Sequence, residues 1–494
     1  MTTGTETGST AAIFDWLASQ PSGGFSEEVS ELSIHLGMLH EPDIPAAQYH
    51  RCIELFYGRA LRIAVECRPR LIEIGLPMNR SLHSLSRQLV ASLITIAEGL
   101  LQAMERVRNE SIRNQNNPID TLAARGLRML CEAYEIAGLS GGSPTPKLWG
   151  CAFDLFASSA ADTPPGETGS SDSVQFAFKR LLAIACIQIE RLSQSEISWT
   201  SEYLDRIATL VQIDNTPPVT TDASCFWIAC KADEAPCAFL RKAPPQEGPL
   251  LYISMAPLAK RTAEYLARLE AGQQPLELNL PKLAAGVQAT ALLQRLRHQW
   301  TVPAKREQPR RKSQYSVQAC AGIPAIWKTL HANNPPDESA IQEWQVSNES
   351  PNGFAIIHVA GKIAGLSAGM AISLRTSPEE PWTICVVRWI RSTTPEQIEL
   401  GLQVASTGAT PVTIGFRSAR ERSSRMVNAL VLPALPALRH HPAVLAPLGT
   451  YSSRRFALVS DIEKIYIAQG RLLSLDMQTA TIELFQFEID PYPI

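Results

Sequence analysis

At 494 residues the chain is too long for one hydrophobic core, so several domains are expected. Its 45 Lys and Arg against 48 Asp and Glu give a formal net charge of −3, which excludes a whole-molecule field attracting nucleic acid or an anionic membrane. Hydrophobic residues make up 45% and charged residues 19%, which is typical of a globular rather than a disordered protein.

The termini and the cysteines predict a cytoplasmic location. The N-terminal MTTGTETGSTAAIFDW has no basic flank followed by an apolar core, so we expect no secretory signal. Apolar segments such as LLAIACIQI at 181–189 are far shorter than the roughly 20 residues of a membrane-spanning helix. The ten cysteines are scattered, which favours reduced thiols. Cys225, Cys230 and Cys237 cluster, but at no zinc-binding spacing, so a buried strand is favoured over a metal site.

From about 12 to 212 the pattern is helical, and we predict an all-α domain over 1–215. A loop rich in Gly, Ser and Pro interrupts it at 162–173. We expect this domain to be the output or partner-binding region, although a packed bundle without a ligand is the simpler interpretation. The clearest helix spans 83–107, where one apolar face recurs every three or four residues through Leu85, Leu89, Leu93, Ile96, Leu100, Ala103 and Val107.

Residues 216–304 mix both patterns and predict a small α/β connecting segment. CFWIACKA and PLLYISM are strand-like, whereas APLAKRTAEYLARLEAG and LAAGVQATALLQRLRHQW are helix-like. After about 312 the chain becomes a series of short apolar segments divided by turn residues, which is typical of a sandwich or a small barrel. We therefore predict a multidomain α+β protein ending in two β modules, at 305–410 and 411–494.

A basic segment, KREQPRRKSQYSV, precedes the first β module. Pro303 and Pro309 oppose a continuous helix, so this is a flexible connector. It is either a solvated linker or an arm that binds an anion. Its charges are five positive against the single negative Glu307, or +4, and come from Lys305, Arg306, Arg310, Arg311 and Lys312.

Two motifs stand at this boundary. Arg306 and Arg310 form an RxxxR motif, the only arginine pair in the chain with that spacing. Asn348, Ser350 and Gly353 form an NxSxxG motif, at a break between two apolar segments.

In this order, and on a β-rich segment, the two motifs resemble those of the PilZ domain family, which binds the bacterial second messenger cyclic di-GMP. The resemblance covers about 305–410, a small β-barrel in that family, and includes the VVRWI segment, which is similar to its VxW strand. It implies cyclic di-GMP as the ligand of Arg306, Arg310, Asn348, Ser350 and Gly353, with Arg311 and Lys312 as auxiliary phosphate contacts. The gap of 37 residues between the motifs is long for the family, and HANNPPDESA at 331–340 looks like an insertion.

The chemistry of the residues suits this ligand. A guanidinium can bind phosphate with two nitrogens, stack on a base, or donate to guanine O6 and N7. Asn348 and Ser350 can bond to their own backbone and fix the loop. Gly353 would supply a positive φ or a close approach to the ligand. Arg388 and Trp389 should alternate across a strand, one facing the core and the other the ligand surface.

The leading hypothesis is a cytoplasmic receptor whose connector becomes ordered on the barrel when cyclic di-GMP binds, reorienting the helical domain. An alternative is a PilZ-like adaptor that binds no nucleotide and acts through an unknown protein partner. A weaker one is a nucleic-acid binder using 305–312 and the arginine-rich 417–425. No GxSxG, P-loop, GxGxxG or HExxH motif occurs, so we expect neither enzymatic activity nor a cofactor or metal.

Overall fold

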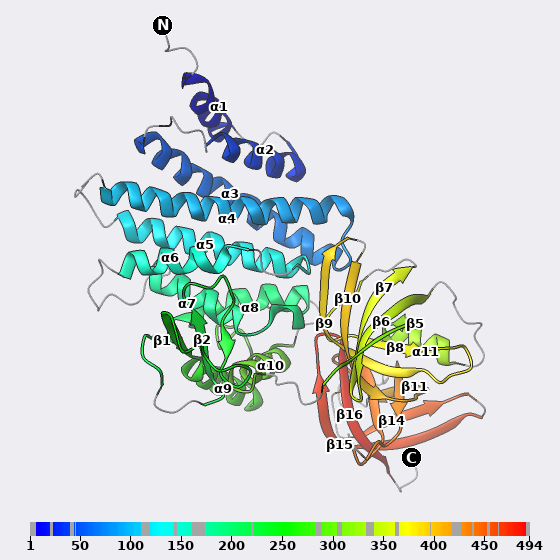
Figure 1. The fold of residues 1–494 in the computed structure, drawn as a ribbon. Coiled ribbons are helices and arrows are strands. Elements are labelled where there is room, and N and C mark those ends of the chain that lie inside the picture. The colour runs from blue at the N-terminus through cyan, green and yellow to red at the C-terminus, as the bar shows by residue number, and fades with distance from the viewer. Residues whose placement is uncertain are drawn as a thin grey trace.

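A computed structural model gives the fold, drawn in Figure 1. The structure describes residues 6–490 except for 20–22, 40–43, 45, 110–117, 143–145, 161–172, 219–221, 283–287, 304–308, 332–339, 361–364, 396, 417–425, 437–438, 452–454 and 463.

The first part of the chain is a stack of helices laid roughly side by side (Figure 1). They bury apolar stripes against one another, and Leu89, Leu93 and Leu100 of α4 are fully buried as their spacing predicted. The elements are α1 (Glu6–Ala18), α2 (Phe25–Met38), α3 (Ala46–Ile74), α4 (Arg80–Asn109), α5 (Pro118–Leu139), α6 (Leu148–Ala160), α7 (Val174–Ala185), η1 (Ile189–Arg191), α8 (Gln194–Ile207) and η2 (Ala208–Leu210).

A small sheet with two helices follows. Its strand order is β1-β4-β2-β3, and Cys225, Cys230 and Cys237 lie in or beside its strands as thiols. Within the described residues, no group of three or more His, Cys, Asp or Glu side chains could hold a metal ion. The elements are β1 (Gln212–Asp214), β2 (Cys225–Ala229), β3 (Cys237–Ala238), β4 (Leu250–Ser254), α9 (Ala256–Glu270) and α10 (Ala289–Thr301).

The first β module is a closed six-stranded barrel with the order β10-β7-β6-β5-β8-β9. Alternate residues of its strands, such as Val346, Ile356 and Leu402, fill the interior. A helix that the sequence analysis missed, α11, leaves the barrel after β5. The elements are β5 (Arg311–Ala321), α11 (Ile323–Leu330), β6 (Ile341–Ser350), β7 (Gly353–Ala360), β8 (Ala371–Arg375), β9 (Thr383–Thr394) and β10 (Gln397–Ser406).

The second β module is also a closed barrel, with the order β11-β12-β13-β16-β15-β14. It shares an apolar core with the first, in which Ile384 and Val386 of β9 pack with Leu445 and Leu484. Polar contacts add to this joint, because the Trp327 indole of α11 donates to the Val412 carbonyl at 2.9 Å. The elements are β11 (Thr410–Phe416), β12 (Val427–Leu432), β13 (Ala443–Pro447), β14 (Arg455–Ser460), β15 (Tyr466–Gln478) and β16 (Ile482–Ile489).

The helical part meets the first barrel at the end of the β9–β10 hairpin (Figure 1). The Ser392 amide of β9 donates to the Gly141 carbonyl at 2.8 Å, and the Leu366 amide donates to the Leu76 carbonyl at 2.8 Å. An ion pair joins Arg391 of β9 to Glu190 of η1 at 3.4 Å. The contacts of Ser392 and Arg391 connect the helices to β9, the strand that also packs against the second barrel.

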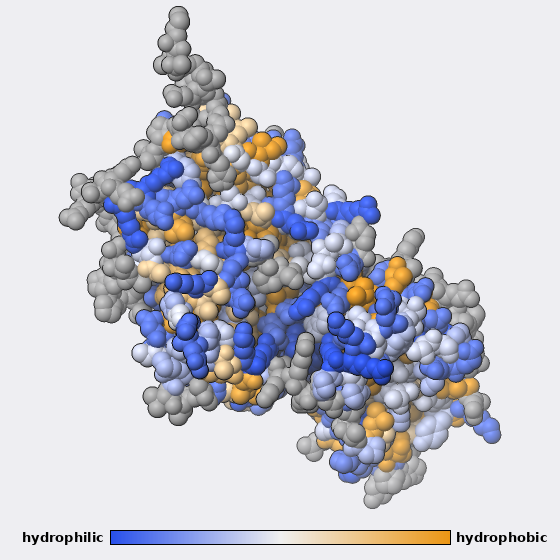
Figure 2. All heavy atoms as spheres, in the orientation of Figure 1, coloured by the Kyte–Doolittle hydropathy of each residue, from blue (hydrophilic) through white to orange (hydrophobic). Residues whose placement is uncertain are grey.

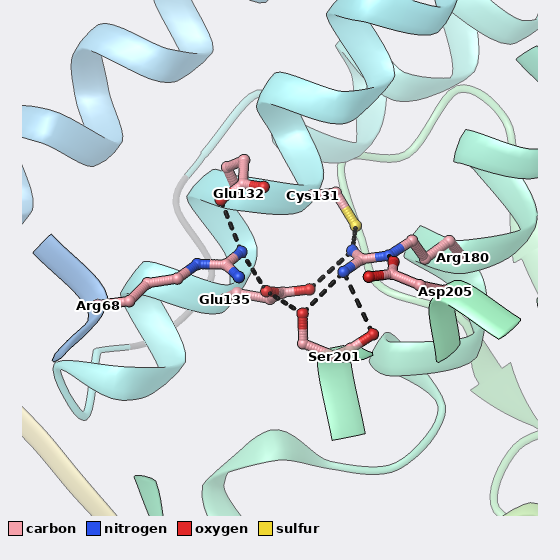
Figure 3. A network of polar contacts seen from close by, with 7 residues as sticks. All are labelled: Arg68, Cys131, Glu132, Glu135, Arg180, Ser201 and Asp205. Carbon is pink, nitrogen blue, oxygen red and sulfur yellow. Dashed lines mark hydrogen bonds and ion pairs between the residues drawn. The ribbon is translucent and has the colours of Figure 1, made fainter. Parts of the chain in front are cut away.

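A buried polar network ties four helices together inside the helical part (Figure 3). Arg180 of α7 donates to Glu135 of α5 at 2.7 Å and pairs with Asp205 of α8. Arg68 of α3 pairs with both Glu132 and Glu135. Burial alone would raise the pKa of Glu135, but Arg180 and Arg68 outweigh burial and hold that pKa below its usual range. Glu135 is therefore a buried carboxylate that depends on two arginines.

The predicted fold class is confirmed: a helical region, a small mixed segment and two β modules, both of them closed barrels. The domain boundaries at 215, 304 and 410 stay a prediction. In the described part of the chain, no helix combines the length and the apolar character needed to cross a membrane.

Candidate functional site

The NxSxxG motif forms a tight β-hairpin. Asn348 and Ser350 are the last residues of β6, and Gly353 is the first of β7, paired with Ser350. Ser350 Oγ donates to the Gly353 carbonyl at 3.3 Å and closes the turn. The expectation of a loop is therefore wrong for Asn348 and Ser350, which are strand residues held by the barrel's backbone pairing.

The two motifs meet in the structure. The Arg310 guanidinium donates to Asn348 Oδ1 at 2.8 Å, across 38 residues of sequence. Arg306 lies outside the described residues, as do Lys305 and most of the 331–340 insertion. Because Arg310 reaches Asn348, the long gap between the motifs does not keep their described parts apart.

The auxiliary residues belong to a strand, since β5 begins at Arg311 and Lys312 lies opposite Asn348. Both are exposed. The sequence analysis placed them in a flexible connector, but strand pairing fixes their backbone next to the motif.

Glu349, inside the motif, was missed by the sequence analysis. Its carboxylate accepts hydrogen bonds from Ser313 Oγ and from the Tyr315 hydroxyl, both at 2.8 Å. The bond from Tyr315, followed by that from Ser313, lowers the pKa of Glu349. Burial, with the nearby Glu349 charge, raises the pKa of Tyr315 to about 12. These bonds fix the register of β5 against β6 and so hold Asn348 opposite Lys312.

Gly353 is required by close packing and not by a special dihedral angle, because its φ is not positive. A Cβ atom at Gly353 would lie 2.2 Å from the carbonyl oxygen of Leu402 on β10. The positive φ predicted for this glycine is therefore wrong, and the close approach seen here is to a neighbouring strand of the barrel; close approach to a ligand stays a prediction.

Five cross-strand partners form a row on the outer face of the barrel: Lys312, Asn348, Ala355, Gly401 and Trp389. We call it the outer row. At the usual spacing of about 4.8 Å between strands, its four steps span roughly 19 Å. Its middle members, Ala355 and Gly401, are small, and the Trp389 ring lies against Gly401, where a Cβ would meet the indole nitrogen at 1.9 Å. The row is thus polar at one end and aromatic at the other.

Arg388 and Trp389 do not alternate as predicted. The register of β9 against β10 shifts between Gly401 and Leu402, the mark of a β-bulge. Val387 and Ile390 face the barrel core, whereas Trp389 lies on the outer face and Arg388 is exposed. The bulge places both residues outside the core, beside one another at the far end of the outer row.

The arrangement offers groups suited to recognising a nucleotide. A guanidinium and two exposed cations at one end can bind a phosphate, and the Asn348 carboxamide can bond to a base edge. An indole at the other end, with the Arg391 guanidinium 5.0 Å from its ring centroid, offers an aromatic surface.

Comparison with known families identifies the barrel. Residues 11–218 match the family model described as the N-terminal domain of the cyclic-di-GMP receptor FimW, and residues 328–411 match the model described as its middle PilZ domain. Residues 328–411 are therefore similar to the PilZ domain family, which confirms the resemblance seen in the sequence. A relative named cyclic-di-GMP receptor FimW, from Pseudomonas aeruginosa, is 22% identical over 87% of this chain and 83% of its own. The PilZ match includes Asn348, Ser350 and Gly353 and begins after the arginine motif.

Proposed function

We propose that this protein is a cytoplasmic bacterial receptor for cyclic di-GMP that couples nucleotide binding to its helical region. The family models and the Pseudomonas relative, which are named for this ligand, support the assignment. The single observation that carries it is the Arg310–Asn348 hydrogen bond, which joins the described halves of the two motifs on one barrel face.

In this proposal the nucleotide lies along the outer row. Arg306 and Arg310 bind it from the connector side, and Asn348 and Ser350 bind it from the hairpin, which Gly353 keeps closed against β10. Arg311 and Lys312 add phosphate contacts. Arg310 must exchange its bond to Asn348 for bonds to the ligand, so binding repositions the connector that links α10 to β5.

The helical region is the output surface of the receptor. The contacts of Ser392 with Gly141 and of Arg391 with Glu190 connect it to β9, the strand at the end of the outer row. A nucleotide that bends β9 or the connector changes the orientation of the helices, and an unknown protein partner reads that change.

The test is calorimetric titration of cyclic di-GMP into the wild type and the Arg306→Ala/Arg310→Ala variant. Each lost bond to a charged group should weaken binding by about 1.5–3 kcal/mol. Cyclic di-AMP serves as the ligand control and should bind much more weakly, because adenine lacks the O6 acceptor of guanine.

Equal affinity of wild type and double variant, or no heat with the wild type, would refute the assignment. If the wild type gives no heat of binding, the adaptor alternative is favoured. That alternative predicts that the helical region captures the same protein partner with and without cyclic di-GMP. The nucleic-acid alternative requires salt-dependent retention of single-stranded RNA. Of the two segments on which it depends, 417–425 and residues 305–308 of 305–312 lie outside the described residues.

A further inference from the structure

A second group of arginines lies where the helical part, the mixed segment and the first barrel meet. Figure 2 shows strongly hydrophilic side chains gathered on the viewed face at this junction. The Arg391–Glu190 ion pair holds η1 against β9. Arg191 directly follows Glu190 at the end of η1, and Arg388 precedes Arg391 by three residues on β9, so both lie close to this contact.

These arginines carry more positive charge than their neighbours neutralise. The Glu190 carboxylate is engaged by Arg391, and Arg295 of α10 is paired with Glu196. For Arg191 and Arg388, the described part of the chain provides no ion-pair partner. Like charges held together in a partly desolvated junction repel one another, and an anion placed between them removes that cost.

The pKa values of Arg191 and Arg388 are both shifted in the direction expected for neighbouring positive charges. Burial, and next the charge of Arg388, lower the pKa of Arg191 to about 10. The surrounding protein and then the charge of Arg295 lower the pKa of Arg388, although that side chain is exposed. Both guanidinium groups remain charged at neutral pH, in an environment that disfavours their charge.

The position of the pair connects it to the outer row. Arg388 is next to Trp389, the aromatic end of the row, and three strand steps of roughly 14 Å in total separate Trp389 from Asn348. A ligand whose ring lies over the small residues Ala355 and Gly401 in the middle of the row can therefore turn one phosphate toward Arg310 and the other toward the β9 bulge.

We propose that Arg191 of the helical region and Arg388 of the barrel form an anion site for the second phosphate of a cyclic dinucleotide bound on the outer row. The inference rests on the proposed function and extends the ligand site from the barrel onto the helical region. The helical region then contributes a side chain to the site, so ligand binding draws η1 and β9 together directly.

The decisive variant is Arg191→Ala, because Arg191 lies outside the PilZ barrel. Calorimetry of the full-length chain with cyclic di-GMP should show an affinity lower by roughly tenfold or more, the range of a lost bond to a charged group. Arg388→Ala should behave alike. Arg191→Lys should recover part of the loss, since it keeps the charge but not the two-nitrogen geometry. The control is Arg206→Ala on α8, an exposed arginine of the same region, which should stay within about twofold of the wild type.

Unfolding measurements separate a ligand contact from a structural role. Without ligand, Arg191→Ala should be at least as stable as the wild type, because it relieves repulsion with Arg388, whereas a structural residue would lose stability when truncated.

Two results would overturn the inference while leaving the receptor assignment intact. One is wild-type affinity in Arg191→Ala while Arg310→Ala loses binding. The other is an Arg191-dependent rise in melting temperature with inorganic pyrophosphate alone and no effect of Arg191→Ala on nucleotide affinity, which would mark a site for free anions. No nucleotide binding by the wild type would refute the receptor assignment itself, and this inference with it.

Discussion

Glu135→Gln should destabilise the helical part by about 3 kcal/mol or more, because removing one partner of a buried ion pair leaves the other charge uncompensated. Glu135 is almost fully buried and bonds to both Arg68 and Arg180, so the change leaves two arginines short of a counter-charge (Figure 3). Urea denaturation followed by far-UV circular dichroism measures the effect, since urea, unlike guanidinium, does not screen ion pairs.

Glu66→Gln is the matched control. Glu66 pairs with Arg70 one helical turn away on α3, with side chains 50% and 49% exposed. An exposed pair of this kind contributes about 0.3–0.5 kcal/mol. Equal destabilisation by both variants would contradict a special role for the buried network.

The pH dependence of the Glu135→Gln effect follows from the direction of the pKa shift. The folded-state pKa of Glu135 lies below that of the unfolded chain, which is about 4.3. Its contribution is therefore fully present above about pH 5 and is lost as the pH falls through the folded value. The difference between wild type and variant should stay constant from pH 7 to about pH 5 and shrink below about pH 4. A difference that grows with acid would contradict this sign.

Gly353→Ala should damage both the barrel and the nucleotide site. The added Cβ would lie 2.2 Å from a backbone oxygen of β10, so β7 and β10 must separate locally at the end of the hairpin. Overpacking of this kind costs about 1–3 kcal/mol. The displacement also shifts Ser350 and Asn348, and we expect cyclic di-GMP affinity to fall by about tenfold or more. Thermal unfolding and calorimetry on the same preparation measure the two effects.

Gly408→Ala provides the comparison, because a Cβ at Gly408 would meet nothing within 4 Å. This variant should match the wild type in affinity and in melting temperature. If Gly353→Ala behaves like Gly408→Ala, then the close approach of β10 does not control the site.

The periodicity of the sequence predicted the fold class because both kinds of core follow simple rules. Three- and four-residue steps mark the buried face of α4, and alternation marks the barrel strands. The local alternation of apolar and polar residues does not show whether a sheet closes into a barrel. The sequence therefore predicted a sandwich or a barrel without deciding between them, and the structure shows that each β module is a closed barrel. Helix α11 escaped notice because its eight residues are too few for a clear period.

Part of the candidate site could be predicted from a sequence motif. The rest depends on contacts between segments that are distant in the sequence. The spacing of Asn348, Ser350 and Gly353 predicted them as ligand-binding residues, which stays a prediction, but the close packing that requires Gly353 involves Leu402, 49 residues away in sequence. The outward position of Trp389 depends on a bulge against β10, which strict alternation cannot anticipate. Nothing in the sequence indicated Arg191 as a ligand contact, because only the folded chain brings η1 to β9.

The contacts between the two barrels limit how the barrels can move relative to each other when a ligand binds. The Gly369 carbonyl of the first barrel accepts hydrogen bonds from the hydroxyls of Thr479, at 2.7 Å, and Thr481, at 3.0 Å, in the second. With the apolar core that the two barrels share, these contacts hold them together, and a second apolar cluster, which includes Leu76 and Leu366, joins the helices to the first barrel. Any rotation at the helical contact therefore carries the second barrel along. Displacement grows with distance from the rotation axis, so a probe on the second barrel should move farther than one on the first barrel and report ligand binding with greater sensitivity (Figure 1).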